Sequence, residues 1–120
     1  MDVEIPFFWQ FPRNCCESAS ILLSESVLLV YPEKQIYFVR SRLDSTIHIW
    51  IEIDDLVFDV TLDQFEKYDA PVIGGDKVMH HNRFDECESI LYENEKAQNS
   101  WFPEKEQTFK EVAKSILGIA

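Results

Sequence analysis

Apolar positions recur along residues 15–31 with the period of an α-helix. Ala19, Leu23 and Val27 follow one another at spacings of four residues, and the segment contains no glycine or proline. Asn14, directly before the segment, belongs to the residue types that cap helix N-termini, and a proline follows the segment. The pattern predicts a helix that is apolar on nearly every side and is therefore largely buried.

The pattern then changes to the alternation of apolar and polar positions that is typical of strands. Residues 46–53 carry isoleucine at every second position, and residues 56–61 follow them after the acidic pair Asp54 and Asp55. Two such segments joined by a two-residue turn form an antiparallel hairpin. A weaker alternation over residues 35–40 predicts a further strand of this sheet.

The rest of the chain predicts additional strands and then helices. Residues 71–73 and 77–79 are short apolar segments on either side of two glycines, which favours one or two more strands. After Asn82 the pattern becomes helical, first with a small stripe and then with a helix that has Pro103 near its first turn and ends at Gly118. The stripe consists of Phe84, Cys87 and Leu91, and the apolar positions of the last helix are Phe109, Val112, Ala113, Ile116 and Leu117. We expect one α+β domain over residues 1–120.

Composition narrows the range of partners. The 120 residues are 46% hydrophobic and 13% aromatic, which is enough for one core. Twenty-two acidic residues against eleven basic ones give a formal net charge of −11, which repels nucleic acid and anionic membrane surfaces. No apolar stretch reaches the ~20 residues of a membrane span, and the N-terminus lacks the basic start of a signal peptide. We expect a soluble, cytoplasmic protein that binds neither nucleic acid nor membranes.

The cysteines and the paired histidines do not form a metal site. The chain has three cysteines, of which Cys15 and Cys16 are adjacent and Cys87 is remote, and this set matches neither an even disulfide framework nor a paired zinc motif. We expect reduced thiols, with Cys87 as an ordinary small hydrophobic residue. His80 and His81 have no nearby pattern of further ligands and are expected to be exposed. The sequence implies no metal and no organic cofactor.

Hairpin geometry brings a histidine and a carboxylate together. With the turn at residues 54 and 55, Trp50 faces Asp59 and His48 faces Thr61. Opposite residues of an antiparallel pair point to the same side of the sheet, as do residues two apart along a strand, so all four share one face. His48 and Asp59 are diagonal neighbours, roughly 7 to 8 Å apart at the backbone and within hydrogen-bonding reach through their side chains. Trp50 beside them fits either the wall of an active site or a packed core.

Cys16 adds a thiol to this pair. It falls in the first turn of the predicted helix, where unpaired N–H groups and the helix dipole stabilise a thiolate. Cys15 lies in the same turn and competes on this criterion, but helix phase favours Cys16, because Cys16 shares a stripe with Ala19 and Leu23 that would pack on the sheet. The three side chains are either a nucleophile, its base and the orienting carboxylate, or buried packing residues.

Three segments carry a resemblance to a known family: residues 11–20 (FPRNCCESAS), residues 48–52 (HIWIE) and residues 58–65 (FDVTLDQF). Together they resemble the papain-like and transglutaminase-like superfamily, and they are most similar to its small bacterial members with a cysteine, a His-x-Trp and an Asp-x-Thr-x-x-Gln-Phe segment. The resemblance covers about residues 7–81. It implies a papain-like α+β fold, in which a helix that carries the nucleophile packs against an antiparallel sheet.

The resemblance also implies roles for individual residues. Cys16 would be the nucleophile, His48 the general base and later acid, and Asp59 the carboxylate that orients the histidine. Gln10 stands six residues before Cys16 and would complete the oxyanion hole together with the backbone N–H of the nucleophile. His81 belongs to a late aromatic-His segment of the family and would lie at the rim of the substrate cleft.

The activity expected from this resemblance is that of a cysteine-dependent hydrolase or acyltransferase. Peptidases, deamidases and transglutaminases share the chemistry, in which the enzyme attacks an amide or ester and forms a thioester. A protein or peptide is the expected substrate, with Trp50 and His81 as candidate binding residues. The alternative is a non-catalytic module on the same scaffold, whose acidic surface binds a basic protein.

Overall fold

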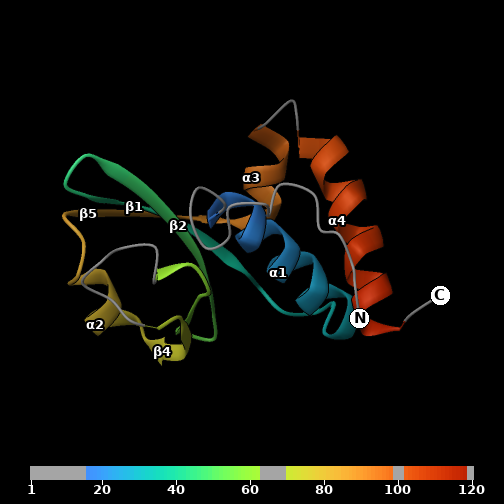
Figure 1. Ribbon diagram of the computed structural model, residues 1–120, viewed down its shortest axis with the longest axis horizontal. Coiled ribbons are helices and arrows are strands. Elements are labelled where there is room, and N and C mark those ends of the chain that lie inside the picture. The colour runs from blue at the N-terminus through green and yellow to red at the C-terminus, as the bar shows by residue number, and fades with distance from the viewer. Residues whose placement is uncertain (1–15, 63–69, 99–101, 119–120) are drawn as a thin grey trace.

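The computed structural model describes residues 16–62, 70–98 and 102–118 (Figure 1). The elements in chain order are α1 (Cys16–Val30), β1 (Tyr37–Leu43), β2 (Thr46–Ile53), β3 (Leu56–Asp59), β4 (Val72–Asp76), α2 (Lys77–His81), β5 (Glu86–Leu91), α3 (Tyr92–Gln98) and α4 (Phe102–Leu117). The fold of the described residues is therefore α+β, as expected, and it has five strands and four helices.

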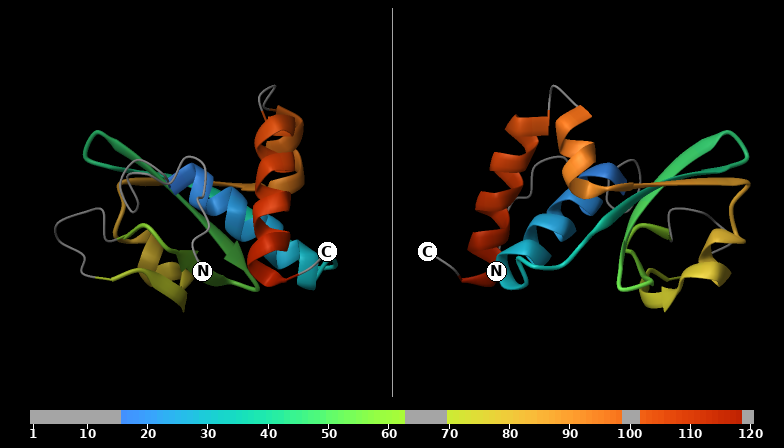
Figure 2. Two further views of the ribbon diagram at one scale, coloured as in Figure 1. Left: turned by 45° about the vertical axis from the view of Figure 1, so that its right-hand side comes forward. Right: turned by 180° about the vertical axis from the view of Figure 1, so that it is seen from behind.

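The strands form one sheet in the order β4-β3-β2-β1-β5, and every neighbouring pair is antiparallel. Helix α1 crosses the middle of the molecule and packs on both β2 and α4. Figures 1 and 2 show α3 and α4 at one end of the molecule, and β4 with α2 at the other. No helix in the described ranges is long and apolar enough to cross a membrane.

The turn between β2 and β3 is the predicted two-residue turn. Asp54 and Asp55 both have left-handed backbone angles, with φ of 53° and 64°. A tight hairpin turn of this kind needs positive φ at both central residues, and aspartate tolerates that conformation better than most residues. Ile53 pairs with Leu56, and the numbers of paired residues sum to 109 along the β2–β3 ladder. The predicted register is confirmed.

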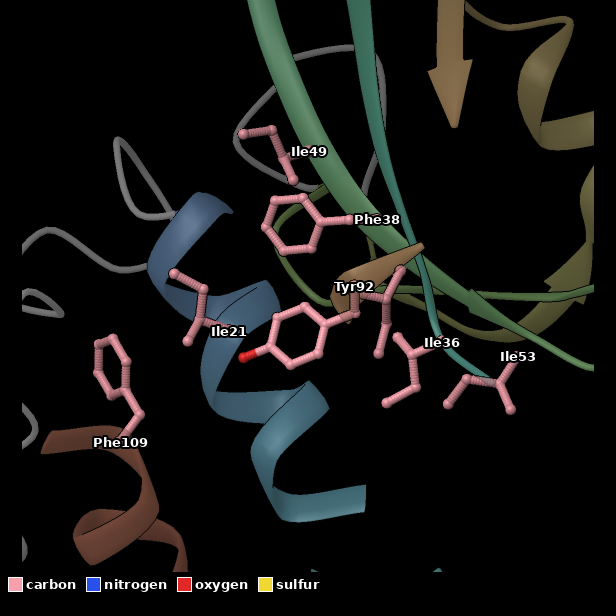
Figure 3. Packing of buried hydrophobic residues seen from close by; sticks show 8 residues of the cluster. Ile21, Ile36, Phe38, Ile49, Ile53, Tyr92 and Phe109 are labelled. Atoms are coloured by element: carbon pink, nitrogen blue, oxygen red, sulfur yellow. The ribbon is translucent and has the colours of Figure 1, made fainter. Parts of the chain in front are cut away.

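The isoleucine face of the sheet packs against the helices. Ile49, Ile51 and Ile53 of β2 belong to a cluster with residues of α1, α3 and α4. Figure 3 shows the ring of Tyr92 between α1 and the strands, with its hydroxyl toward α1. The buried members are Ile21, Ile36, Phe38, Ile49, Ile51, Ile53, Tyr92 and Phe109. Ile47 departs from the pattern and is 57% exposed, because this cluster ends before it.

The opposite face of the sheet has a core of its own. Trp50 is fully buried at its centre, between β1, β3 and the segment after α2. The buried members of this second cluster are Val39, Trp50, Val57, Leu62 and Phe84. The face that carries His48 is therefore packed and sheltered from solvent rather than open.

Helix α1 is largely buried, as predicted, but its buried side is partly polar. Ser20, Ser24 and Glu25 are each less than 5% exposed. Glu25 accepts a hydrogen bond of 2.6 Å from the Tyr92 hydroxyl and lies 3.4 Å from the Lys96 ammonium. Because a buried carboxylate needs such partners, this group ties α1 to α3.

Two predicted elements were wrong. Residues 77–79 are helical rather than extended, because the side chain of Asp76 accepts a hydrogen bond of 2.7 Å from the Met79 backbone N–H and caps α2. Residues 86–91 form strand β5 instead of a helix, and they pair with β1 at the edge of the sheet. That partner lies far away along the chain, so local periodicity could not reveal it.

The other boundaries are close to those predicted. Helix α1 begins at Cys16 in the described residues, β2 has the predicted bounds, β1 is shifted to Tyr37–Leu43, and β3 stops at Asp59. The last helix has Pro103 in its first turn and is followed by Gly118 with φ of 72°, the left-handed conformation that ends many helices. Of its apolar positions, Phe109 and Ala113 are fully buried.

Candidate active site

The expected contact between His48 and Asp59 is present. His48 projects from β2 and Asp59 is the last residue of β3. The Nε2 atom of His48 lies 2.8 Å from each carboxylate oxygen of Asp59, and neither side chain is exposed to solvent. The contact follows from the hairpin register, which puts both residues on the face of Trp50.

The two groups hold each other in their charged forms. Burial alone would lower the pKa of His48, but hydrogen bonds with Asp59 and Cys16 and the charges of these two residues raise it to about 9. Burial alone would raise the pKa of Asp59, but hydrogen bonds with His48 and His80 bring it below its ordinary value. At neutral pH the pair is therefore an imidazolium beside a carboxylate.

Cys16 reaches the same imidazole from α1. It is the first described residue of that helix and is half-buried, and its side chain is one of the hydrogen-bond partners that raise the pKa of His48. His48 contacts Asp59 through Nε2, so Nδ1 is the ring nitrogen left for the thiol. The described structure therefore contains the expected contact of His48 with Asp59, and Cys16 acts on the pKa of the same imidazole.

Ser20 fixes the first turn of α1 to the sheet. Its hydroxyl lies 2.7 Å from the backbone oxygen of Cys16 and 3.3 Å from the backbone oxygen of Ile49. Ile49 is the neighbour of His48 and lies beyond the β2–β3 ladder, which pairs residues 51–53 of β2. The single hydrogen of this hydroxyl is therefore shared between a carbonyl of α1 and a carbonyl of β2, which links the first turn of the helix to the strand beside His48.

His80 is a further member of the site that the sequence did not reveal. It was expected to be exposed, but it is 1% exposed, because α2 packs its ring against the edge of Trp50 with 4.5 Å between ring centroids. Its Nε2 atom lies 2.8 Å from Asp59 Oδ2. The structure gathers all three histidines of the chain, His48, His80 and His81, around the ring of Trp50, and local sequence carries no signal of this.

Trp50 and His81 have different surroundings. Trp50 is fully buried, and its indole N–H donates a hydrogen bond of 2.9 Å to Glu52. The Nε2 atom of His81 lies 2.5 Å from the same carboxylate oxygen, and the side chain of His81 is 25% exposed. Trp50 therefore forms a wall behind the histidines, whereas His81 lies at the border with solvent.

The remaining predicted site residue, Gln10, lies outside the described residues, as does the competing thiol Cys15. The third cysteine, Cys87, is half-buried on β5, and burial followed by the charge of Glu52 raises its pKa. In the ranges that the structure describes, no three histidine, cysteine, aspartate or glutamate side chains are grouped as metal ligands.

An apolar groove of about 180 Å³ begins one helical turn from Cys16. Its described lining comes from α1, the end of α4 and the residue after Asp59, namely Ala19, Leu22, Leu23, Ser26, Val60 and Ile116. A larger cavity of about 580 Å³ lies over β1, β2 and β5 and is lined by Arg40, Ser41, Arg42, Ile47, Glu86, Cys87 and Glu88. Of the two, the apolar groove lies alongside the helix that carries the thiol.

The cluster contains a thiol, an imidazole and a carboxylate from three separate elements, α1, β2 and β3. An ion pair sheltered from water beside a half-exposed thiol suits nucleophilic chemistry, because a nearby imidazolium stabilises a thiolate. The chain matches none of the protein-family models, none of the curated proteins and none of the solved structures with which it was compared.

Proposed function

We propose that this protein is a cysteine-dependent hydrolase or acyltransferase of the papain-like or transglutaminase-like type, which acts on an amide or ester bond. The observation that carries the proposal is the 2.8 Å contact of the buried His48 with Asp59, on an imidazole whose pKa Cys16 also raises. A thiol, its base and the group that orients the base are the parts that such an enzyme requires.

The first half of the reaction forms a thioester. The Cys16 thiolate, whose proton is already on the His48 imidazolium, attacks the carbonyl carbon of the substrate. The carbonyl oxygen becomes negatively charged and is stabilised by the positive end of the helix dipole and backbone N–H groups at the first turn of α1. His48 then gives its proton to the leaving nitrogen or oxygen, and the bond to the leaving group breaks.

The second half of the reaction releases the acyl group. Water or an amine attacks the thioester carbonyl, His48 accepts the proton of the nucleophile, and the Cys16 sulfur leaves. Water gives a peptidase or deamidase, and an amine gives a transglutaminase-type transferase. The family resemblance adds Gln10 as a second oxyanion donor and favours a protein or peptide substrate.

Electrostatics support these assignments. The raised pKa of His48, about 9, keeps the imidazole protonated at neutral pH, so a thiolate at Cys16 has a positive partner. The lowered pKa of Asp59 keeps the carboxylate ionised, as an orienting group needs to be. A reducing compartment such as the cytoplasm fits these roles, since the two cysteines among the described residues, Cys16 and Cys87, are free.

The reaction with p-nitrophenyl acetate tests the proposal. We expect a burst of p-nitrophenolate that approaches one equivalent of protein, with the acetyl group located on Cys16 by mass spectrometry. Cys16→Ala should abolish the burst. Cys87→Ala removes the second half-buried thiol of the described residues and should retain the burst. No burst from the wild-type protein, or acetylation mainly at another residue, would favour the non-catalytic binding module instead.

A further inference from the structure

Asp59 is held by two imidazoles rather than one. His48 approaches it from β2 and His80 from α2, and both Nε2 atoms lie 2.8 Å from Asp59 Oδ2. All three side chains are buried. A histidine, its carboxylate and a cysteine would suffice for the proposed chemistry. The contact of His80 with Asp59 is therefore not explained by that chemistry alone.

Arg83 determines which nitrogen of His80 carries the proton. A guanidinium nitrogen of Arg83 lies 3.1 Å from Nδ1 of His80. Because a guanidinium can only donate hydrogen bonds, Nδ1 must be the acceptor. The hydrogen of the neutral ring is then on Nε2, and it points at Asp59. His80 is a neutral donor to the carboxylate and does not compete with His48 for a proton.

Helix α2 is fixed well enough to hold this donor in place. Its N-terminus is capped by Asp76, and the backbone N–H of Arg83 donates a hydrogen bond of 3.1 Å to the His80 carbonyl. The ring of His80 packs on Trp50 and lies 5.5 Å from that of Phe84 between centroids. The donor therefore has one orientation, and so does the carboxylate that receives it.

We propose that His80, held by Arg83, is a positioning residue that keeps the Asp59 carboxylate ionised and aimed at His48. The inference rests on the proposed function, whose orienting carboxylate it explains. The titratable groups around Asp59 in the described residues come from separate elements: His48 from β2, His80 from α2 and, through His48, Cys16 from α1. Glu52 shares the face of β2 and is engaged by Trp50 and His81.

Titration of the Asp59 carboxyl carbon by ¹³C NMR tests the proposal with two variants of one residue. His80→Phe keeps an aromatic ring and removes the donor, so the pKa of Asp59 should rise by about one pH unit or more. His80→Gln keeps an N–H near the position of Nε2, so the titration should stay close to that of the wild type. A merely structural residue would affect stability in both variants without separating their titrations, and equal titration curves would overturn the proposal.

Arg83→Met provides a second, independent reading. This variant leaves the contacts of Asp59 in place and removes the donor to Nδ1 of His80. We expect the ¹⁵N shifts of His80 to change from a single Nε2–H tautomer to a mixture of the two. If His80→Phe does not fold, the ¹⁵N shifts of His80 in Arg83→Met become the test of the proposal. An unchanged tautomer would refute the role of Arg83, and a mixture of the two tautomers would support it.

Failure of this inference can be distinguished from failure of the proposed function. The Asp59 titration and the His80 tautomer are measured without any substrate, whereas the burst with p-nitrophenyl acetate requires a reactive Cys16. Separated titrations of the His80→Phe and His80→Gln variants, with no burst from the wild type, would leave His80 as a positioning residue in a protein that is not an esterase. A burst from the wild type, with coincident titrations of the two His80 variants, would support the enzyme and refute His80 as a positioning residue.

Discussion

The buried pair of His48 and Asp59 makes the stability of the protein depend on pH. The pKa of His48 is raised from an ordinary value of 6.5 to about 9 in the folded protein. Because one pKa unit corresponds to about 1.4 kcal/mol, the pair contributes up to about 3 kcal/mol to the free energy of unfolding. A raised pKa gives its full contribution below the unfolded value, so stability should fall as the pH rises from about 6.5 through about 9.

Asp59→Asn should remove this dependence. The amide has no charge, so only Cys16 would then oppose the effect of burial, and the pKa of His48 would fall towards its ordinary value. Urea unfolding between about pH 6 and about pH 9 measures the free energy, and the Cε1–H signal of His48 in NMR reports its pKa. We expect a nearly flat pH profile for Asp59→Asn, which should be the less stable protein at the acidic end.

Asp55→Asn is the matched control, since it makes the same chemical change in the exposed turn, where Asp55 lies 3.7 Å from Lys77. It should keep the wild-type pH profile, because an exposed ion pair contributes little. The reasoning would be refuted if Asp59→Asn kept both the wild-type slope and the raised pKa of His48.

Two further substitutions test the surroundings of the site by urea unfolding. Ser20→Ala removes a hydroxyl that lies near the Ile49 carbonyl as well as a carbonyl of its own helix, and it should cost about 1–2 kcal/mol and slow acetylation of Cys16. Ser26→Ala removes a hydroxyl that bonds a carbonyl of its own helix, so it is the control and should do neither. Tyr92→Phe removes a donor to the buried Glu25 and should cost about 1–3 kcal/mol, against little change for Tyr37→Phe at a 40% exposed position. Equal losses within either pair would contradict the assigned contacts.

Local patterns were sufficient to predict the hairpin and, with it, half of the candidate site. The alternation in β2 and the two aspartates of the turn determine the register, and the register determines that His48 and Asp59 share a face. The helical periodicity of the segments before and after the sheet likewise predicted α1 and α4. Each of these periods lies within one continuous stretch of the sequence, so it can be recognised without knowledge of distant partners.

Features that depend on distant partners could not be predicted in this way. Strand β5 exists because β1 offers it an edge, although its own sequence carries a weak helical stripe. His80 is buried because α2 packs on Trp50, and the expectation of an exposed histidine pair came from local sequence alone. Ser20 resembles an ordinary helix serine until the strand edge at Ile49 is known.

Selective alkylation tests the central claim most directly. Cys16 and Cys87 are both half-buried, but Cys16 contacts His48, while burial and Glu52 raise the pKa of Cys87. After brief exposure to iodoacetamide at about pH 6, mass spectrometry should find Cys16 modified far faster than Cys87, and His48→Gln should remove this preference. Modification at the rate of an ordinary thiol, or mainly at Cys15 or Cys87, would contradict the assignment of Cys16 as an activated nucleophile.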